Sequence, residues 1–484
     1  MKSKWIPMLL CTALTVGLFA GCGSDKTPTT TQTEALTTQS TAASTTAPAG
    51  YPRATTEDVK KALSDAGAVV LDARISDAYN GWQIDGAARG GHIEGAENFS
   101  ADWLTCDYDD KNNLEQETRE QVLSGYLTDK NLTADQNVIV YDTNGQDAEA
   151  VADYLRAQGL EHISLYDANE WIADETLEMD SYENYELLVP ADVVHEIVTG
   201  NIPADFSDEE KIIIVDVSWG DNEASGYKGG HVPTAIHVNT DSFEPPMEYV
   251  EGKTEWRLAD DAALLQLLLD NGITSDSCVI VTGPEPMAAS RFAVICQYMG
   301  VEDVRVMNGA LTTWMARGYE LETGENIPEK AAEFGETTPE NPELIIRLDG
   351  IQSVLENPEY TLVDNRTWEE YIGESTGYSY HDLAGRIDGA VFGYAGKKNS
   401  SSMSYYRNID KTMRNADEIL AMWEACGIDP DGHLVFMCGS GWRAAEVLWD
   451  AQVMGLDDVS LYTDGWIAWS NEGNPSLTGD PNAA

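Results

Sequence analysis

A pattern that occurs three times along the 484 residues constrains the fold more than any other feature of this sequence. In each copy an apolar stretch ends in an aspartate, and a Gly-x-[Ile/Val]-x-x-Ala segment follows it. A second apolar stretch then runs into a short loop, a helical pattern that closes on glycine, and a further apolar stretch. The same order of landmarks in three places predicts three copies of one structural unit. The aspartates are Asp72, Asp216 and Asp364, and the loops begin at Asp142, Thr282 and Cys438.

The elements expected within each copy define the fold class. Short stretches of β-branched and apolar residues alternate with helical patterns, such as residues 58–67 and 416–427. This alternation predicts an α/β fold with three tandem domains, each a mostly parallel sheet flanked by helices. Polar stretches that contain proline, near residues 178–190 and 324–342, are the expected linkers. The predicted domains are residues 51–185, 186–328 and 339–484.

The N-terminus has the features of an export signal. Lys2 and Lys4 precede an apolar stretch that ends in Phe-Ala-Gly-Cys at Cys22, which resembles the lipidation box of bacterial lipoproteins. The resemblance implies that residues 1–22 are a lipoprotein signal peptide and that Cys22 carries the lipid; an ordinary cleaved signal is the alternative. Residues 23–50 are rich in threonine and lack aromatic residues, which predicts a disordered tether. We therefore expect an exported protein, lipid-anchored to the outer face of the bacterial cell membrane.

The charge of the chain limits its partners. Its 83 acidic and 29 basic residues give a net charge of −54, which argues against nucleic-acid binding. An anionic substrate would need a local concentration of basic side chains, and the third copy has one. Arg386 replaces the histidine of the other two copies and is expected, with Arg443, to bind an anion, whereas Arg366 is expected to pair with Asp364. The basic residues of this concentration are Arg366, Arg386, Lys397, Lys398, Arg407, Lys411, Arg414 and Arg443.

The loop that begins at Cys438 has a residue pattern suited to nucleophilic chemistry. The cysteine directly follows an apolar strand, and Gly439 and Gly441 allow the backbone to curl tightly before a helix that starts near Arg443. Amide groups of the loop would point at the sulfur, and the helix N-terminus adds partial positive charge. Such a setting stabilises a thiolate, which can attack an electrophile and hold a negatively charged adduct.

This combination of motifs resembles the rhodanese family of sulfurtransferases, and in particular the three-domain thiosulfate sulfurtransferases of bacterial envelopes. The most specific matches lie in the third copy: CGSGWRA from Cys438, DGWIAW from Asp464, and GRIDGAVFGYAGKKNSSSMSYY from Gly385. In that family the loop cysteine takes the outer sulfur of thiosulfate, releases sulfite and becomes a persulfide. A thiol or cyanide-like acceptor then removes the sulfur.

The resemblance implies a role for individual residues. Cys438 is the expected catalytic sulfur carrier, a small anionic sulfur donor binds beside it, and no cofactor is expected. Asp142 and Thr282 stand at the cysteine position in the first two copies, so those domains are expected to be inactive. The implied substrate-binding residues are Gly439, Ser440, Gly441, Trp442, Arg443 and Arg386.

Several alternatives stay open at the level of sequence. The donor could be 3-mercaptopyruvate, because the Cys-Gly-Ser-Gly loop opening also resembles that of mercaptopyruvate sulfurtransferases. A phosphatase or arsenate reductase loop would place arginine six positions after the cysteine, whereas Arg443 is five positions after Cys438. A non-catalytic binding lipoprotein and a redox sensor are the remaining alternatives.

The other cysteines are expected to have structural roles. Cys296 is expected in a helix core, and Cys106, Cys278 and Cys426 carry no motif, although a disulfide among them is left open. The chain has no Cys-x-x-Cys pair, so neither a zinc site nor a thioredoxin-type dithiol is indicated.

Overall fold

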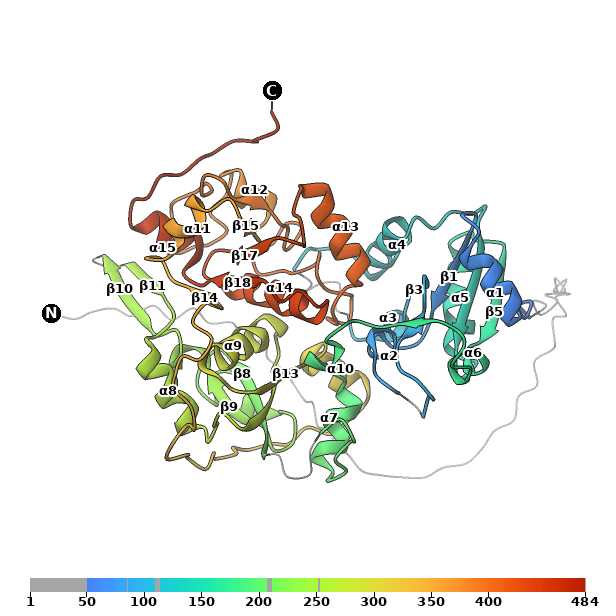
Figure 1. Cartoon of the computed structure of the whole chain (residues 1–484), viewed down its shortest axis with the longest axis horizontal. Coiled ribbons are helices and arrows are strands. Elements are labelled where there is room, and N and C mark those ends of the chain that lie inside the picture. The colour runs from blue at the N-terminus through green and yellow to red at the C-terminus, as the bar shows by residue number, and fades with distance from the viewer. Residues whose placement is uncertain (1–49, 85, 109–113, 207–210, 251–252, 484) are drawn as a thin grey trace, which may run out of the picture. The chain divides into compact units, whose positions relative to one another are not determined.

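The computed structural model describes residues 50–84, 86–108, 114–206, 211–250 and 253–483. The predicted signal peptide, the lipidated Cys22 and all but the last residue of the predicted tether lie outside the described residues. From Tyr51 onward the chain forms one compact unit with three parallel sheets, one for each copy of the repeat (Figure 1).

The first domain contains a parallel sheet of order β3-β1-β4-β5, and Arg53 adds a parallel bridge to Leu165 of β5. Strands β2 (His92–Ile93) and β6 (Met179–Asp180) form a separate antiparallel pair. The strands of the sheet are β1 (Ala68–Asp72), β3 (Glu97–Asn98), β4 (Asn137–Asp142) and β5 (Ile163–Asp167). The helices are α1 (Thr56–Leu63), α2 (Ser76–Asn80), α3 (Asp102–Thr105), α4 (Arg119–Asp129), α5 (Asp147–Ala157) and α6 (Asn169–Ala173).

The second domain contains a parallel sheet of order β7-β13-β12-β8-β9. Strands β10 (Pro246–Val250) and β11 (Lys253–Trp256) form an antiparallel pair outside it. The sheet strands are β7 (Leu188–Val189), β8 (Lys211–Ser218), β9 (Ile236–Asn239), β12 (Ser277–Thr282) and β13 (Asp303–Met307). The α-helices are α7 (Ala191–Val198), α8 (Asp261–Asp270), α9 (Pro286–Met299) and α10 (Ala310–Ala316), and the 3-10 helices are η1 (Tyr185–Leu187), η2 (Tyr227–Gly229) and η3 (Thr240–Ser242).

The third domain contains a parallel sheet of order β14-β18-β17-β15-β16, which is the order of the second domain. The shared order confirms the predicted fold class of three α/β domains. The strands are β14 (Ile345–Ile346), β15 (Tyr360–Asp364), β16 (Val391–Phe392), β17 (His433–Met437) and β18 (Val459–Tyr462). The helices are α11 (Ile351–Glu356), α12 (Trp368–Tyr371), α13 (Ala416–Cys426), α14 (Trp442–Val453) and α15 (Gly465–Asn471).

Both faces of the third sheet are buried, which explains why its central strand is apolar throughout. In β17, Leu434 and Phe436 pack into one hydrophobic cluster with residues of α13 and α14. Val435 and Met437 pack into a second cluster with residues of α11 and α15. Successive side chains of a strand point to opposite faces, so a sheet covered by helices on both faces needs apolar residues at every position. Strand β17 is therefore packed on both faces up to its last residue, Met437, which directly precedes the cysteine loop.

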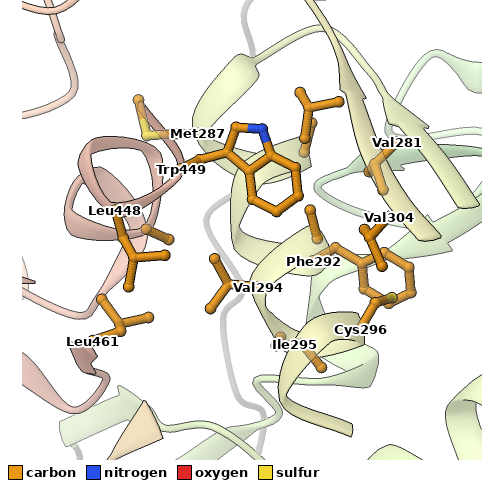
Figure 2. Close-up of a cluster of buried hydrophobic side chains, with 14 of the residues drawn as sticks. Val281, Met287, Phe292, Val294, Ile295, Cys296, Val304, Leu448, Trp449 and Leu461 are labelled. Atoms are coloured by element: carbon orange, nitrogen blue, oxygen red, sulfur yellow. The ribbon is translucent and has the colours of Figure 1, made fainter. Parts of the chain in front are cut away.

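Helices α9 and α14 join the second and third domains through a continuous apolar core. Figure 2 shows Leu448 and Trp449 of α14 extending toward α9, where Val294 faces them. Each large apolar side chain that is fully buried contributes about 1.5–3 kcal/mol to stability. Cys296 lies on α9 within the same cluster and is fully buried, which confirms the expected helix-core role. All five described cysteines have free thiols.

Several ion pairs between domains use basic residues of the third domain. Arg414 pairs with Asp129 of the first domain, and Lys411 Nζ lies 2.6 Å from Glu285 Oε1 of the second domain. These side chains therefore hold the domains together. These contacts do not support the expectation that these side chains gather around an anionic substrate, because acidic residues far away in sequence lie within ion-pair distance of them. Lys397–Glu117 and Arg407–Glu285 are further pairs of this kind, and Lys130 of the first domain pairs with Glu418 of the third.

Candidate active site at the Cys438 loop

The loop that holds Cys438 connects β17 to α14 and depends on its two glycines. Gly441 adopts a φ of +87°, and a Cβ at this position would lie 2.6 Å from the carbonyl oxygen of Thr463. A Cβ at Gly439 would lie 1.9 Å from the hydroxyl oxygen of Tyr378. A side chain is therefore excluded at Gly441, and at Gly439 it would displace the Tyr378 ring from its place over the loop. Helix α14 begins at Trp442, one residue before the predicted start.

The N-terminus of α15 fixes the orientation of the loop peptides. The Trp466 N–H donates to the Cys438 carbonyl and the Ile467 N–H donates to the Gly439 carbonyl, each at 2.9 Å. In a trans peptide the C=O and N–H groups point in opposite directions, so the amides of Gly439 and Ser440 point away from α15. This is the orientation required for amides that hold an anion within the loop.

A cavity of about 340 Å³ opens at Cys438, whose residue exposure is only 1%. Its lining comes from the second and the third domain. Of the described residues that line it, Arg443 alone is basic. The lining residues of the third domain are Tyr378, Tyr380, Ser400, Ser401, Cys438, Ser440, Trp442, Arg443 and Ile467. Those of the second domain are Trp219, Thr240, Asp241, Glu244, Trp256 and Met287.

The residues of the second domain that line the cavity include two that contact Trp442 of the third domain. The indole Nε1 of Trp442 donates to Glu244 Oε2 at 2.7 Å, and the ring of Trp219 lies 5.1 Å from that of Trp442. Glu244 is buried and pairs with Arg291 of α9 at 2.6 Å. Burial raises the pKa of Glu244, and the Arg291 guanidinium opposes that rise. The second domain therefore contributes a paired carboxylate and an aromatic surface to the site.

Arg443 is neutralised by a carboxylate of its own domain. Its Nη1 and Nη2 donate to the two oxygens of Glu370 at 2.8 and 2.9 Å, and Nη2 also donates to the Tyr378 hydroxyl at 2.9 Å. Although burial acts to raise it, the guanidinium lowers the pKa of Glu370 below its ordinary value. Glu446, which follows Arg443 by three residues on α14, pairs with Arg407. Arg443 lies at the cavity as predicted, but as one half of a buried ion pair.

Comparison with known proteins identifies the family. The model of the rhodanese-like domain matches residues 55–171, 204–317 and 349–472, and each segment contains the central strand of one sheet. The chain belongs to the rhodanese family.

Two thiosulfate sulfurtransferases are among the curated relatives of this rhodanese. YnjE of Escherichia coli is 36% identical over 414 residues, which cover 85% of this chain and 89% of YnjE. The Bos taurus thiosulfate sulfurtransferase is 25% identical over 269 residues, which cover 54% of this chain and 86% of the bovine protein.

Solved structures of enzymes that handle sulfur are also similar. The anaerobic ergothioneine biosynthesis enzyme from Chlorobium limicola, in complex with trimethyl histidine, is 31% identical, with a TM-score of 0.79 over 89% of this chain and 100% of that chain. A structure of EanB with a cysteine persulfide and ergothioneine is 31% identical, with a TM-score of 0.80 over 89% of this chain and 99% of that chain. The present protein is a sulfurtransferase of the rhodanese type, as its third-copy motifs predicted.

Arg386 does not lie among the residues that line the cavity of this rhodanese domain. Its Nη1 donates to the Gly479 carbonyl at 2.7 Å, and its guanidinium lies 5.0 Å from the ring centroid of Tyr371. In the other two domains a histidine stacks on the corresponding tyrosine, so Arg386 has taken over a packing role. The expectation that it binds the donor is not supported by this position. The corresponding pairs are Tyr79–His92 and Tyr227–His231, with ring centroids 3.7 and 3.9 Å apart.

Arg366 has the structural role that was expected of it. Its Nε and Nη2 donate to the two carboxylate oxygens of Asp364 at 2.8 and 2.7 Å, and Nη2 also donates to the Gly385 carbonyl at 2.8 Å. The first domain has the same arrangement with Arg74 and Asp72, where Arg74 bonds the Gly91 carbonyl at 2.7 Å.

The corresponding loops of the first two rhodanese domains differ in what occupies them. In the first, the carboxylate of Asp142 accepts from the Ala148 N–H at 2.9 Å, so the N-terminus of α5 holds a carboxylate of its own chain. In the second, Thr282 is fully buried and its hydroxyl has no hydrogen-bond partner among the described residues. Neither residue carries a thiol, and the inactivity of these domains stays a prediction.

Sequence reasoning missed the aromatic and acidic residues that complete the site. Tyr378 and Tyr380 lie in an aromatic segment after α12, and that local clustering was the one available signal. Trp219, Trp256 and Glu244 belong to the second domain, about one domain length from Cys438 in sequence, and no motif connects them to it. Among the described residues, no group of three or more His, Cys, Asp or Glu side chains could hold a metal ion.

Proposed function

We propose that Cys438 carries sulfur from a thiosulfate-type donor to a thiophilic acceptor. The Cys438 thiolate attacks the outer sulfur of thiosulfate, the S–S bond breaks, and sulfite leaves with the bonding electron pair. The resulting persulfide gives its outer sulfur to a nucleophilic acceptor, and Cys438 leaves again as a thiolate. The observation that carries this proposal is the position of Cys438, at the base of a cavity in a loop whose amides point away from α15.

The donor would be held by the loop itself rather than by unpaired cations. Arg443 is paired with Glu370, so it offers polarity without net charge. The amides of Gly439 and Ser440 and the N-terminus of α14 then supply the positive potential for the donor oxygens. Ser440 lines the cavity, and its hydroxyl is a further donor. In EanB a threonine two residues after the persulfide cysteine was varied, and Ser440 has this spacing after Cys438.

A test of the proposal follows the sulfur. The full chain is incubated with thiosulfate, and the Cys438 peptide is analysed by mass spectrometry while released sulfite is measured. We expect the peptide to gain the mass of one sulfur atom, with one sulfite released per persulfide. A parallel reaction with 3-mercaptopyruvate, followed by pyruvate release, compares the two donors. Persulfide formation faster from 3-mercaptopyruvate than from thiosulfate would contradict the proposed donor.

A second candidate function concerns the acceptor. The cavity is larger than thiosulfate requires, and aromatic rings together with the carboxylates of Asp241 and Glu244 form much of its lining. Aromatic faces and carboxylates bind organic cations, especially quaternary ammonium groups. The C. limicola enzyme is described with trimethyl histidine, which is such a cation. We therefore propose a trimethylammonium betaine with an imidazole ring as the acceptor: a ring carbon forms a bond to the outer sulfur and loses its proton, and Cys438 leaves as a thiolate. The aromatic lining residues are Trp219, Trp256, Trp442, Tyr378 and Tyr380.

The betaine acceptor is tested with two probes that differ in the trimethylammonium group. Protein loaded with persulfide is mixed with trimethyl histidine or with histidine, and loss of the persulfide is followed with time. A cation–π contact of about 1–2 kcal/mol predicts removal on the order of tenfold faster with trimethyl histidine. A sulfur-containing product is sought in the same samples. Equal rates with the two probes would count against this acceptor class.

We also propose that the protein is exported and anchored by a lipid on Cys22. The Phe-Ala-Gly-Cys box and the threonine-rich residues 23–50 support this proposal. Within the part of the chain that the structure describes, no helix has the length and apolarity to cross a membrane. The Cys22→Ala variant is expected to leave the membrane fraction, as measured by fractionation and by loss of the acyl mass. Unchanged membrane association and unchanged N-terminal processing would contradict the lipid anchor.

A further inference from the structure

Arg291 of the second domain lies buried beneath the cysteine loop of the third. It belongs to α9, and its side chain is fully buried. Its Nη2 donates to the Thr463 hydroxyl of the third domain at 2.5 Å, and its Nε donates to Glu244 at 2.8 Å. A Cβ placed on Gly441 would lie 3.0 Å from Arg291 Nη1, so the guanidinium also contacts the end of the loop. The apolar packing of α9 on α14 holds the helix that carries it (Figure 2).

The contacts of Arg291 reach both sides of the Cys438 loop. Through Glu244 it is connected to the indole of Trp442, the first residue of α14. Through Thr463 it is connected to the turn before α15, whose amides hold the carbonyls of Cys438 and Gly439. The Arg291 guanidinium therefore connects the start of α14, which follows the loop, with the turn before α15, whose amides orient the loop peptides.

We infer that Arg291 is a positioning residue, supplied by the second domain, that keeps the Cys438 loop in the shape needed to form and hold the persulfide. This inference rests on the proposed role of Cys438. The planar guanidinium of arginine suits this role, because it can donate hydrogen bonds to the Glu244 carboxylate and to the Thr463 hydroxyl in fixed directions at the same time. A lysine could satisfy one of these partners but not both with the same geometry. The second domain is thus part of the catalytic unit although it carries no cysteine in its own loop.

The test compares substitutions of two buried arginines of the second domain. Arg291→Met removes the contacts to the loop. Arg305→Met is the matched control, since Arg305 is also buried and paired, with Asp303 on its own strand and over the ring of Phe206. We measure sulfite release in a single turnover with thiosulfate, and amide hydrogen exchange in the peptide that contains residues 438–444. Arg291→Met is expected to slow sulfite release on the order of tenfold to a hundredfold and to speed exchange in that peptide.

Milder substitutions keep the inference testable if Arg291→Met does not fold. Thr463→Val preserves side-chain volume and removes one partner of Arg291, and Arg291→Lys retains the charge. Both are expected to slow single-turnover sulfite release several-fold, while the apparent KM for thiosulfate changes little. A structural role alone would instead lower the melting temperature without changing the rate of the folded protein.

The outcomes separate this inference from the proposed function. If the wild type releases no sulfite, the proposed donor chemistry fails, and amide exchange still tests whether Arg291 orders the loop. If the wild type is active and the Arg291 variants match it in rate and in loop exchange, the positioning role is overturned. Equal losses in Arg291→Met and Arg305→Met would also overturn it, because both would then reflect a general loss of stability.

Discussion

Replacing Cys438 with serine is expected to lower sulfite release from thiosulfate by roughly a thousandfold or more. Serine is close in size to cysteine and leaves the loop glycines, the α15 contacts and the cavity in place. Its hydroxyl cannot carry a sulfane sulfur, so the covalent route is closed while binding remains. The measurements are sulfite release, the mass of the peptide at position 438, and thiosulfate binding by calorimetry.

The matched control is Cys426→Ser, which makes the same change in the same domain. Cys426 is partly buried at the end of α13 and does not line the cavity. We expect this variant to retain most of the wild-type rate. Sulfite release at the wild-type rate from Cys438→Ser would exclude a persulfide on Cys438 as the intermediate.

The second large effect is expected at the buried pair of Arg443 and Glu370. Their side chains are 2% and 1% exposed, so removing either partner leaves an uncompensated charge in the protein interior. Such a loss costs roughly 3–5 kcal/mol. Arg443→Met and Glu370→Gln should therefore each lower the melting temperature strongly, as measured by differential scanning fluorimetry. Sulfite release should fall as well, because Arg443 also holds the hydroxyl of Tyr378 over the loop.

The double variant Arg443→Met with Glu370→Met separates stability from activity. Two apolar side chains can replace a buried ion pair with little loss of stability, so we expect the melting temperature to recover in large part. Activity should stay low, because Tyr378 still lacks its partner. The exposed pair Lys253–Asp382 is the control, and Lys253→Met should change stability little. A double variant as active as wild type would show that Arg443 has no part in the reaction.

The pH dependence of this pair has a defined direction. Because the pKa of Glu370 is lowered from 4.5 in the folded protein, the folded state favours the ionised carboxylate. The stability that the pair contributes is present above the ordinary pKa and is lost as pH falls through the lowered value. The difference in melting temperature between wild type and Glu370→Gln should therefore narrow below about pH 4.5.

The order of the elements and the position of the proposed nucleophile were readable from the sequence. Apolar stretches, glycine turns and helical periodicity are local features, and three similar runs of them specify three similar sheets. The Cys438 loop was equally readable, since a strand end, two glycines and a helix start lie within a few residues of one another. The pairing of Arg366 with its strand aspartate was also predicted, and these two residues are only two positions apart in the sequence.

Only the tertiary structure decided what the basic residues do and which domains build the site. Arg443 pairs with Glu370, 73 residues away, and Arg414 pairs with Asp129, 285 residues away. The local concentration of basic residues in the sequence suggested a site for an anionic substrate, but in the folded protein these residues form ion pairs with carboxylates. Arg386 packs on a tyrosine as a histidine does in the sister domains. The wall around Glu244 and Trp219 comes from the second domain. Such partners are far apart in the sequence. They come into contact only when α9 packs on α14 and the domains pack against one another.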